Sequence, residues 1–108
     1  MIFFKNTVTD DFTIEFEALE GEKTIGSCTL VLKDNVADVT SLTFSEEKPY
    51  AVEGLLRSAY NYAGLKNYYS AKCTAENIDS FLDRMNFEKQ DNEYTGDIPS
   101  ILMGSCCK

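Results

Sequence analysis

The spacing of apolar residues changes once along this chain, and that change limits which elements can share its core. Apolar and polar side chains alternate over residues 12–19, which predicts a β-strand with one face in water. Further strands are expected over residues 24–33 and 36–44, with turns at Gly21 and at Asp34-Asn35. From Val52 onward apolar residues recur at helical spacing instead. The chain therefore reads as an antiparallel three-stranded meander followed by helices and strands in alternation.

The second half of the chain supplies two expected helices and three short strands. The first helix covers residues 49–64, with Pro49 in its first turn, where a missing amide costs little. A strand follows over residues 67–73. The second helix is expected to start at Thr74 as its N-cap and to end at a left-handed Asn86. Residues 87–91 and 98–104 are expected to close the sheet as an antiparallel pair of strands.

These elements predict one α/β (α+β) domain over residues 1–108. The strand–helix–strand unit from residue 36 to residue 73 requires a crossover and hence one parallel step. The sheet is otherwise antiparallel, with two helices. Residues 12–105 form the expected core, residues 1–11 an edge strand or arm, and residues 106–108 a tail.

The element order resembles the later part of the GNAT (acyl-CoA N-acyltransferase) fold. Residues 75–89 resemble the last helix of that superfamily and the Gly-Phe after it, and residues 98–104 resemble its final strand. The resemblance covers residues 12–105. It implies a partial GNAT-like fold, acetyl-CoA or coenzyme A as cofactor, and transfer of an acyl group to a small amine.

The residues that hold the cofactor's phosphates in that superfamily are replaced here. Its motif places an Arg or Gln, then two glycines, at the start of the helix after the third strand. In this chain Glu47 stands at the Arg/Gln position, and Tyr50 and Val52 stand at the glycine positions. Glycines and free amides at a helix start bind phosphate, whereas Pro49 removes an amide and Glu46 adds negative charge.

Two further departures concern catalysis. Leu82 occupies the place of the superfamily's proton-donating Tyr. Only about ten residues precede Phe12, too few for the strand and two helices that build the acceptor side in most members. Because it lacks that half, the chain resembles a short and degenerate member of the superfamily.

Two functions stay open at this point. The first is a degenerate GNAT-like domain used as a binding or oligomerisation module, for instance as a homodimer, since it has open sheet edges and exposed tyrosines. The second is an active N-acetyltransferase in which Glu46 or Glu47 is the base. Its candidate cofactor-binding residues are then Leu42, Thr43, Phe44, Tyr50, Val52 and Asn77.

Composition limits the partners that this protein is expected to bind and the compartment in which it is expected to reside. The net charge of −8 disfavours nucleic acid and anionic membranes. No apolar run approaches the ~20 residues that span a bilayer, and the start lacks a signal-peptide pattern, so we expect a cytoplasmic protein.

Without histidine no Ser-His-Asp or Cys-His site can form. Cys28 and Cys73 are expected in the core and no metal site is expected, with a redox or metal-sensing role for Cys106-Cys107 as a third alternative.

Overall fold

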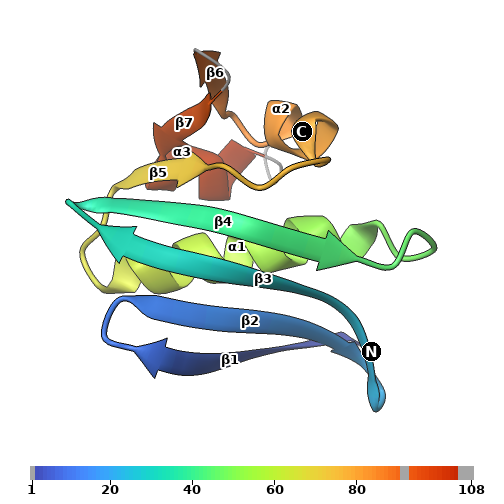
Figure 1. Cartoon of the computed structure of the whole chain (residues 1–108). Coiled ribbons are helices and arrows are strands. Elements are labelled where there is room, and N and C mark those ends of the chain that lie inside the picture. The colour runs from blue at the N-terminus through green and yellow to red at the C-terminus, as the bar shows by residue number, and fades with distance from the viewer. Residues whose placement is uncertain (1, 91–92, 105–108) are drawn as a thin grey trace.

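The structure, a computed structural model, describes residues 2–90 and 93–104, and its strands form one mixed sheet (Figure 1). The strand order is β1-β2-β3-β4-β5-β7-β6, and only the β4–β5 step is parallel. The strands are β1 (Ile2–Asp10), β2 (Thr13–Glu20), β3 (Lys23–Lys33), β4 (Val36–Phe44), β5 (Ser70–Cys73), β6 (Glu88–Gln90) and β7 (Glu93–Asp97). The helices are α1 (Tyr50–Leu65), α2 (Asp79–Arg84) and α3 (Ile98–Gly104). The expected mixed sheet with one parallel step is confirmed.

The meander of β2, β3 and β4 matches the sequence pattern closely. The turn between β3 and β4 consists of Asp34 and Asn35, whose φ angles are 52° and 66°. Two consecutive left-handed residues give the turn a twist that suits a two-residue hairpin. Gly21, with φ 66°, serves the turn between β2 and β3. Alternate residues of β2 are buried, at Ile14, Phe16 and Ala18.

Helix α1 packs along one face of the sheet and forms the centre of the core. Its fully buried side chains are Ala51, Val52, Leu55, Leu56, Ala59, Tyr60 and Ala63. The Tyr60 hydroxyl donates to the Lys72 carbonyl at 2.6 Å, which fastens α1 to β5. A phenol this deeply buried needs such an acceptor, because an unsatisfied hydroxyl would be costly.

The segment 98–104 is a helix, and the prediction of a closing strand there is wrong. The Asp97 carboxylate accepts hydrogen bonds from the Ser100 amide at 2.9 Å and the Ser100 hydroxyl at 3.1 Å, as an N-cap does. Ile98 and Ile101, three residues apart, are buried on one helical face. β7, which ends at Asp97, takes the expected strand's place between β5 and β6. The described residues therefore form a third helix.

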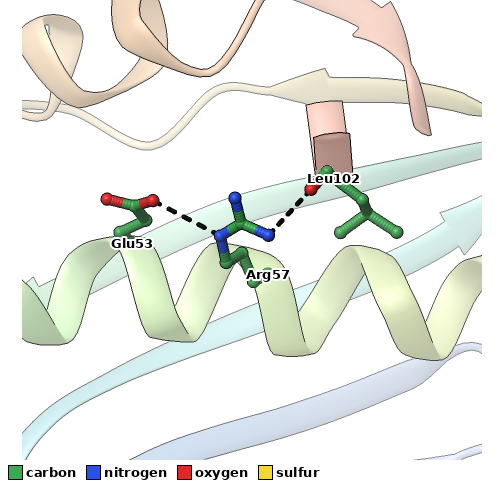
Figure 2. A network of polar contacts seen from close by, with 3 residues as sticks. All are labelled: Glu53, Arg57 and Leu102. Atoms are coloured by element: carbon green, nitrogen blue, oxygen red, sulfur yellow. Dashed lines mark hydrogen bonds and ion pairs between the residues drawn. The ribbon is translucent and has the colours of Figure 1, made fainter. Parts of the chain in front are cut away.

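Arg57 of α1 fastens α3 to the rest of the molecule (Figure 2). Its Nη1 donates to the Leu102 carbonyl at 2.8 Å, and its Nε lies 3.3 Å from Glu53 Oε1. A cation near the carbonyl end of a helix also interacts favourably with the helix dipole. α1 and α3 therefore pack together on the same side of the sheet.

Helix α2 starts later than predicted, and Thr74 is not its N-cap. The amides of Thr74 and Ala75 both donate to the Val39 carbonyl, which keeps this segment against β4. Asn77 then adopts a left-handed φ of 67°, and the helix begins at Asp79. Asn86, with φ 66°, has the left-handed conformation expected after the helix.

Residues 2–10 form a long edge strand, β1. β1 pairs with β2 along its length, from Ile2↔Glu20 to Asp10↔Thr13. Among the described helices, none crosses the face of the sheet opposite α1 and α3 (Figure 1). Hydroxyl groups occur on that open face, where Ser27 and Thr43 hydrogen-bond at 3.1 Å. None of the described helices is long and apolar enough to cross a membrane.

Candidate cofactor site

The two parallel strands separate after a short pairing, and this separation creates the candidate site. The pairing of β4 with β5 runs from Val36↔Ser70 to Val39↔Cys73, whereas β4 itself continues to Phe44. Thr40 is an extra residue in the β3–β4 ladder, since Leu30 pairs with Val39 and Thr29 with Ser41. Such a bulge bends a strand. Ligands of α/β sheets commonly sit where the carboxyl ends of parallel strands diverge.

A hollow of about 410 Å³ lies beside the free end of β4. Its lining residues are Leu42, Thr43, Phe44, Glu46, Glu76 and Asn77. The structure thus brings together four of the candidate cofactor residues and one of the two candidate bases. Glu76, which the sequence analysis did not select, adds a second carboxylate.

Tyr50 and Val52 do not line this hollow. The Val52 side chain is fully buried in the core. Tyr50 points its hydroxyl at Glu20 Oε2, 3.2 Å away, and Lys48 Nζ lies 2.8 Å from Glu20 Oε1. Hydrogen bonds from Lys48 and Tyr50 hold the Glu20 pKa below its usual value. Both Lys48 and Tyr50 therefore attach the start of α1 to the end of β2.

Three backbone amides at the start of α1 donate to carbonyls of the same segment. The Lys48 amide donates to Ser45 O at 2.8 Å, Ala51 to Lys48 O at 3.1 Å, and Val52 to Pro49 O at 3.1 Å. Pro49 has no amide to offer. A phosphate-binding helix start needs free amides directed at the anion. This segment instead forms consecutive tight turns.

Gly54, in the early part of α1, has a packing role. A Cβ at this position would collide with the Phe4 ring of β1. The glycine therefore makes room for a side chain of the same protein, and Phe4 lies over the helix from the edge of the sheet.

Asp38 is a carboxylate that sequence reasoning missed. It lies on β4 opposite Lys72 of β5, and its Oδ1 accepts from the Thr74 hydroxyl at 3.2 Å. Partial burial raises the Asp38 pKa above its usual value, against the hydrogen bond from Thr74. It lines a separate hollow of about 300 Å³ with Lys33, Asp34 and Lys72. The signal that could have found it is an acid between the apolar Ala37 and Val39 of a central strand.

Leu82, which the resemblance places at the position of the superfamily's proton donor, is fully buried in the core. Tyr94 lies nearer the site, in a hollow of about 410 Å³ that shares Glu76 and Asn77 with the first. The Tyr94 pKa is raised, chiefly by desolvation and by the nearby Asp79 and Asp83. A phenol in this setting stays protonated at neutral pH.

The cysteines of the described region are core residues. Cys28 and Cys73 are buried and unpaired, and burial raises their pKa values to about 12 and about 11. Such thiols are poor nucleophiles and poor metal ligands near neutrality. Residues 2–90 and 93–104 contain no cluster of acids and cysteines that could hold a metal ion. Cys106 and Cys107 lie outside the described residues.

Comparison by sequence found neither a matching family model nor a matching curated protein. Comparison by structure gives many matches, and they show the GNAT fold. A protein assigned as an acyl-CoA N-acyltransferase from Klebsiella pneumoniae subsp. pneumoniae superposes with a TM-score of 0.76 at 8% identity, over 91% of this chain and 98% of that one.

Two matching structures contain coenzyme A. PaiA N-acetyltransferase from Thermoplasma acidophilum gives a TM-score of 0.65 at 16% identity, over 78% of this chain and 58% of that one. YhhK from E. coli, assigned as an N-acetyltransferase, gives 0.65 at 15%, over 83% and 75%. This chain thus spans less than two thirds of the PaiA structure. The fold is shared.

Proposed function

We propose that this GNAT-fold chain does not hold coenzyme A by its phosphates and serves as a binding or oligomerisation module. The observation that carries the proposal is the start of α1. There the amides of Lys48, Ala51 and Val52 donate to the chain's own carbonyls, and Pro49 has none. A pyrophosphate placed at this helix would have to displace those bonds.

Electrostatics supports the same conclusion. Glu46 and Glu76 both line the hollow beside β4, and Glu53 lies in the first turn of α1. The whole chain carries a net charge of −8. Coenzyme A is itself strongly anionic, so both the local and the overall field oppose its binding. The same field disfavours nucleic acid and anionic membranes as partners, and the unpaired thiols suit the reducing cytoplasm.

A thermal melt with and without millimolar acetyl-CoA or free coenzyme A tests the proposal. A ligand at 100 times its dissociation constant stabilises the folded state by about 2.7 kcal/mol, which raises the midpoint of such a domain by several degrees. We expect no shift. The matched variant Glu46→Gln/Glu76→Gln asks whether two charges alone prevent binding, and we expect no shift there either. A clear rise with wild-type protein would overturn the proposal.

A second candidate function is an acyl-CoA-dependent N-acyltransferase acting on a small amine. It is favoured by the hollow where β4 leaves β5, and by the coenzyme A bound to two proteins of the same fold. In that reading Leu42, Thr43 and Phe44 hold the cofactor's arm, and Asn77 lies across from them. Glu46 accepts the amine's proton, directly or through water, and Tyr94 protonates the departing thiolate. Glu47 does not line the hollow, which leaves Glu46 the better placed of the two sequence candidates.

Release of free thiol from acetyl-CoA in the presence of a panel of polyamines and amino sugars tests this second candidate. Activity that is lost in Glu46→Gln would establish it and identify the base. Wild-type protein that neither shifts in the melt nor releases thiol would rule it out.

A further inference from the structure

The two edges of the sheet differ in a way that indicates an interface. β6, at one edge, spans three residues and includes the charged Glu88 and Lys89. Short, charged strands are a common protection against edge-to-edge association. β1, at the other edge, spans nine residues and carries no acid before Asp10. Long edges without such protection are sites of strand pairing.

Exposed apolar side chains concentrate at the β1 edge. Phe3, Phe4 and Val8 of β1 are 58%, 40% and 56% exposed, and Phe12 in the adjoining turn is 59% exposed. Only Tyr50, Leu65 and Tyr69 are comparably large and exposed elsewhere among the described residues. The Phe4 ring already lies against Gly54 of α1, so its position is held before any partner arrives.

Building on the proposed function, we infer that β1 is the surface on which this module binds a second copy of itself. The two β1 strands pair antiparallel about a two-fold axis, and the two sheets become one. The charge pattern favours a second copy, because β1 presents one cation and no acid before Asp10, so two copies of an acidic molecule can meet there with little like-charge repulsion. Lys5 is the only charged residue between Ile2 and Thr9.

Symmetry then selects the register. In a symmetric antiparallel pair, opposite residues lie on the same face, so one residue of β1 must lie opposite its own symmetry mate, and the axis passes midway between them. An axis at Lys5 would place two lysines opposite each other, and an axis at Thr7 would place Phe4 opposite the partner's Asp10. An axis at Asn6 places Phe4 opposite the partner's Val8, twice, and leaves Asp10 opposite Ile2 only at the two ends of the paired segment. Such aromatic–β-branched pairs stabilise sheets, whereas like charges destabilise them.

The acids nearest this edge stay apart in the paired form. Glu15 and Glu17 lie on β2, opposite Thr7 and Lys5 of β1. The two β2 strands would be separated by three strand spacings, about 14 Å. That exceeds the Debye length of about 8 Å at physiological salt, and Lys5 lies between the acids of the two copies.

Sedimentation equilibrium across about 1 to 500 µM tests the interface, with two variants of equal charge change. Val8→Lys puts a cation into the expected Phe4–Val8 contact, and Phe12→Lys is the control, equally exposed but outside the paired segment. We expect a wild-type dimer with a dissociation constant in the range of tens of micromolar, as for a small interface, weakened at least tenfold by Val8→Lys and less than twofold by Phe12→Lys. A wild-type monomer throughout, or equal effects of the two variants, would overturn the inference.

Disulfide trapping tests the register independently. Cα atoms of directly opposite residues lie about 4.5–5.5 Å apart, within the range of a disulfide. Asn6→Cys, in a Cys106→Ser/Cys107→Ser background, should therefore crosslink to its symmetry mate under mild oxidation. Thr7→Cys should not crosslink. With the axis at Asn6, the two copies of residue 7 are displaced by two residues along the strands, so their Cα atoms lie more than 7 Å apart. Crosslinking of Thr7→Cys in preference to Asn6→Cys overturns this register.

The outcomes separate this inference from the proposed function. A monomer whose melting midpoint is not shifted by coenzyme A overturns the β1 pairing and leaves the proposed function unaffected. A β1-dependent dimer with a clear coenzyme A shift retains the pairing and overturns the proposed function.

Discussion

At the scale of single residues, the sequence shows where this chain departs from the superfamily's phosphate-binding motif more readily than which side chains line the hollow beside β4. Pro49, Tyr50 and Val52 could be recognised as unsuited to phosphate from their chemistry alone. Asp38 could not be recognised in the same way, because its partial burial depends on β5 and on Thr74, which are more than thirty residues away. Residue type alone therefore predicts whether a position suits a ligand only where the chemistry of that residue, such as the missing amide of proline, is sufficient to determine it.

Asp38 yields a prediction with a definite sign. Its pKa is raised in the folded state, so the folded protein binds the proton more tightly than the unfolded chain does. The stabilising effect of that proton is complete below the unfolded pKa of about 3.9 and is lost as pH rises through the folded value. Ionised Asp38 is therefore a modest liability at pH 7, and Asp38→Asn removes it.

Urea unfolding of Asp38→Asn and wild type at pH 7 and at pH 3.5 measures this effect. We expect the variant to be at least as stable at pH 7, with its relative advantage shrinking as pH falls. Asp34→Asn, in the neighbouring turn, is a control for the loss of one charge. A variant that is clearly less stable at pH 7 would show that the carboxylate's bond with Thr74 outweighs its desolvation.

At the scale of elements, local patterns predicted β2, β3, β4 and α1 almost to the residue. Asn35 and Asn86 adopt left-handed conformations as expected. The errors came where a local signal competed with another. The apolar residues of 98–104 suit a strand, but the Asp97–Ser100 cap and the i, i+3 pair of isoleucines decide for a helix. Thr74 has the chemistry of an N-cap, but hydrogen bonds to Val39 hold its segment to β4.

The β3–β4 turn offers the sharpest test of such a local signal. Asn35 has φ 66°, and a residue with a Cβ and no local hydrogen bonding pays roughly 1–2 kcal/mol in that region. Asn35→Ala should therefore lower the free energy of unfolding by about 1 kcal/mol, and Asn35→Gly should leave it unchanged or raise it. Asn61→Ala makes the same chemical change at an exposed position inside α1, where alanine is the better helix former.

Chemical denaturation of these three variants distinguishes the explanations. Opposite signs for Asn35→Ala and Asn61→Ala are expected. A fall of equal size in both would mean that the turn geometry is not what makes Asn35 suitable.

At the scale of the whole molecule, the fold and the charge have different consequences. The element order was sufficient to recognise the GNAT fold, because the sequence retains the meander, the crossover and the last helix. The proposed pairing at β1 was not predictable in detail, because it depends on which edge is protected; the strand over residues 87–91 was expected, but the sequence pattern placed its partner at residues 98–104 instead of at β7. The edge strand β1 was expected, but its full length of nine residues appears only in the structure.

The net charge then predicts how association should respond to salt. Two copies of a chain with charge −8 repel each other at long range, while the β1 contact itself is apolar and nearly uncharged. Raising the salt screens the repulsion and leaves the Phe4–Val8 contacts unaffected. The dimer's dissociation constant should therefore fall, by about threefold or more, between about 50 and 500 mM NaCl. Sedimentation equilibrium in that series measures it, with Val8→Lys as the control that stays weakened throughout. A dissociation constant that rises with salt would mean that ion pairs hold the copies together, and β1, with Lys5 as its only charge before Asp10, could not be the surface responsible.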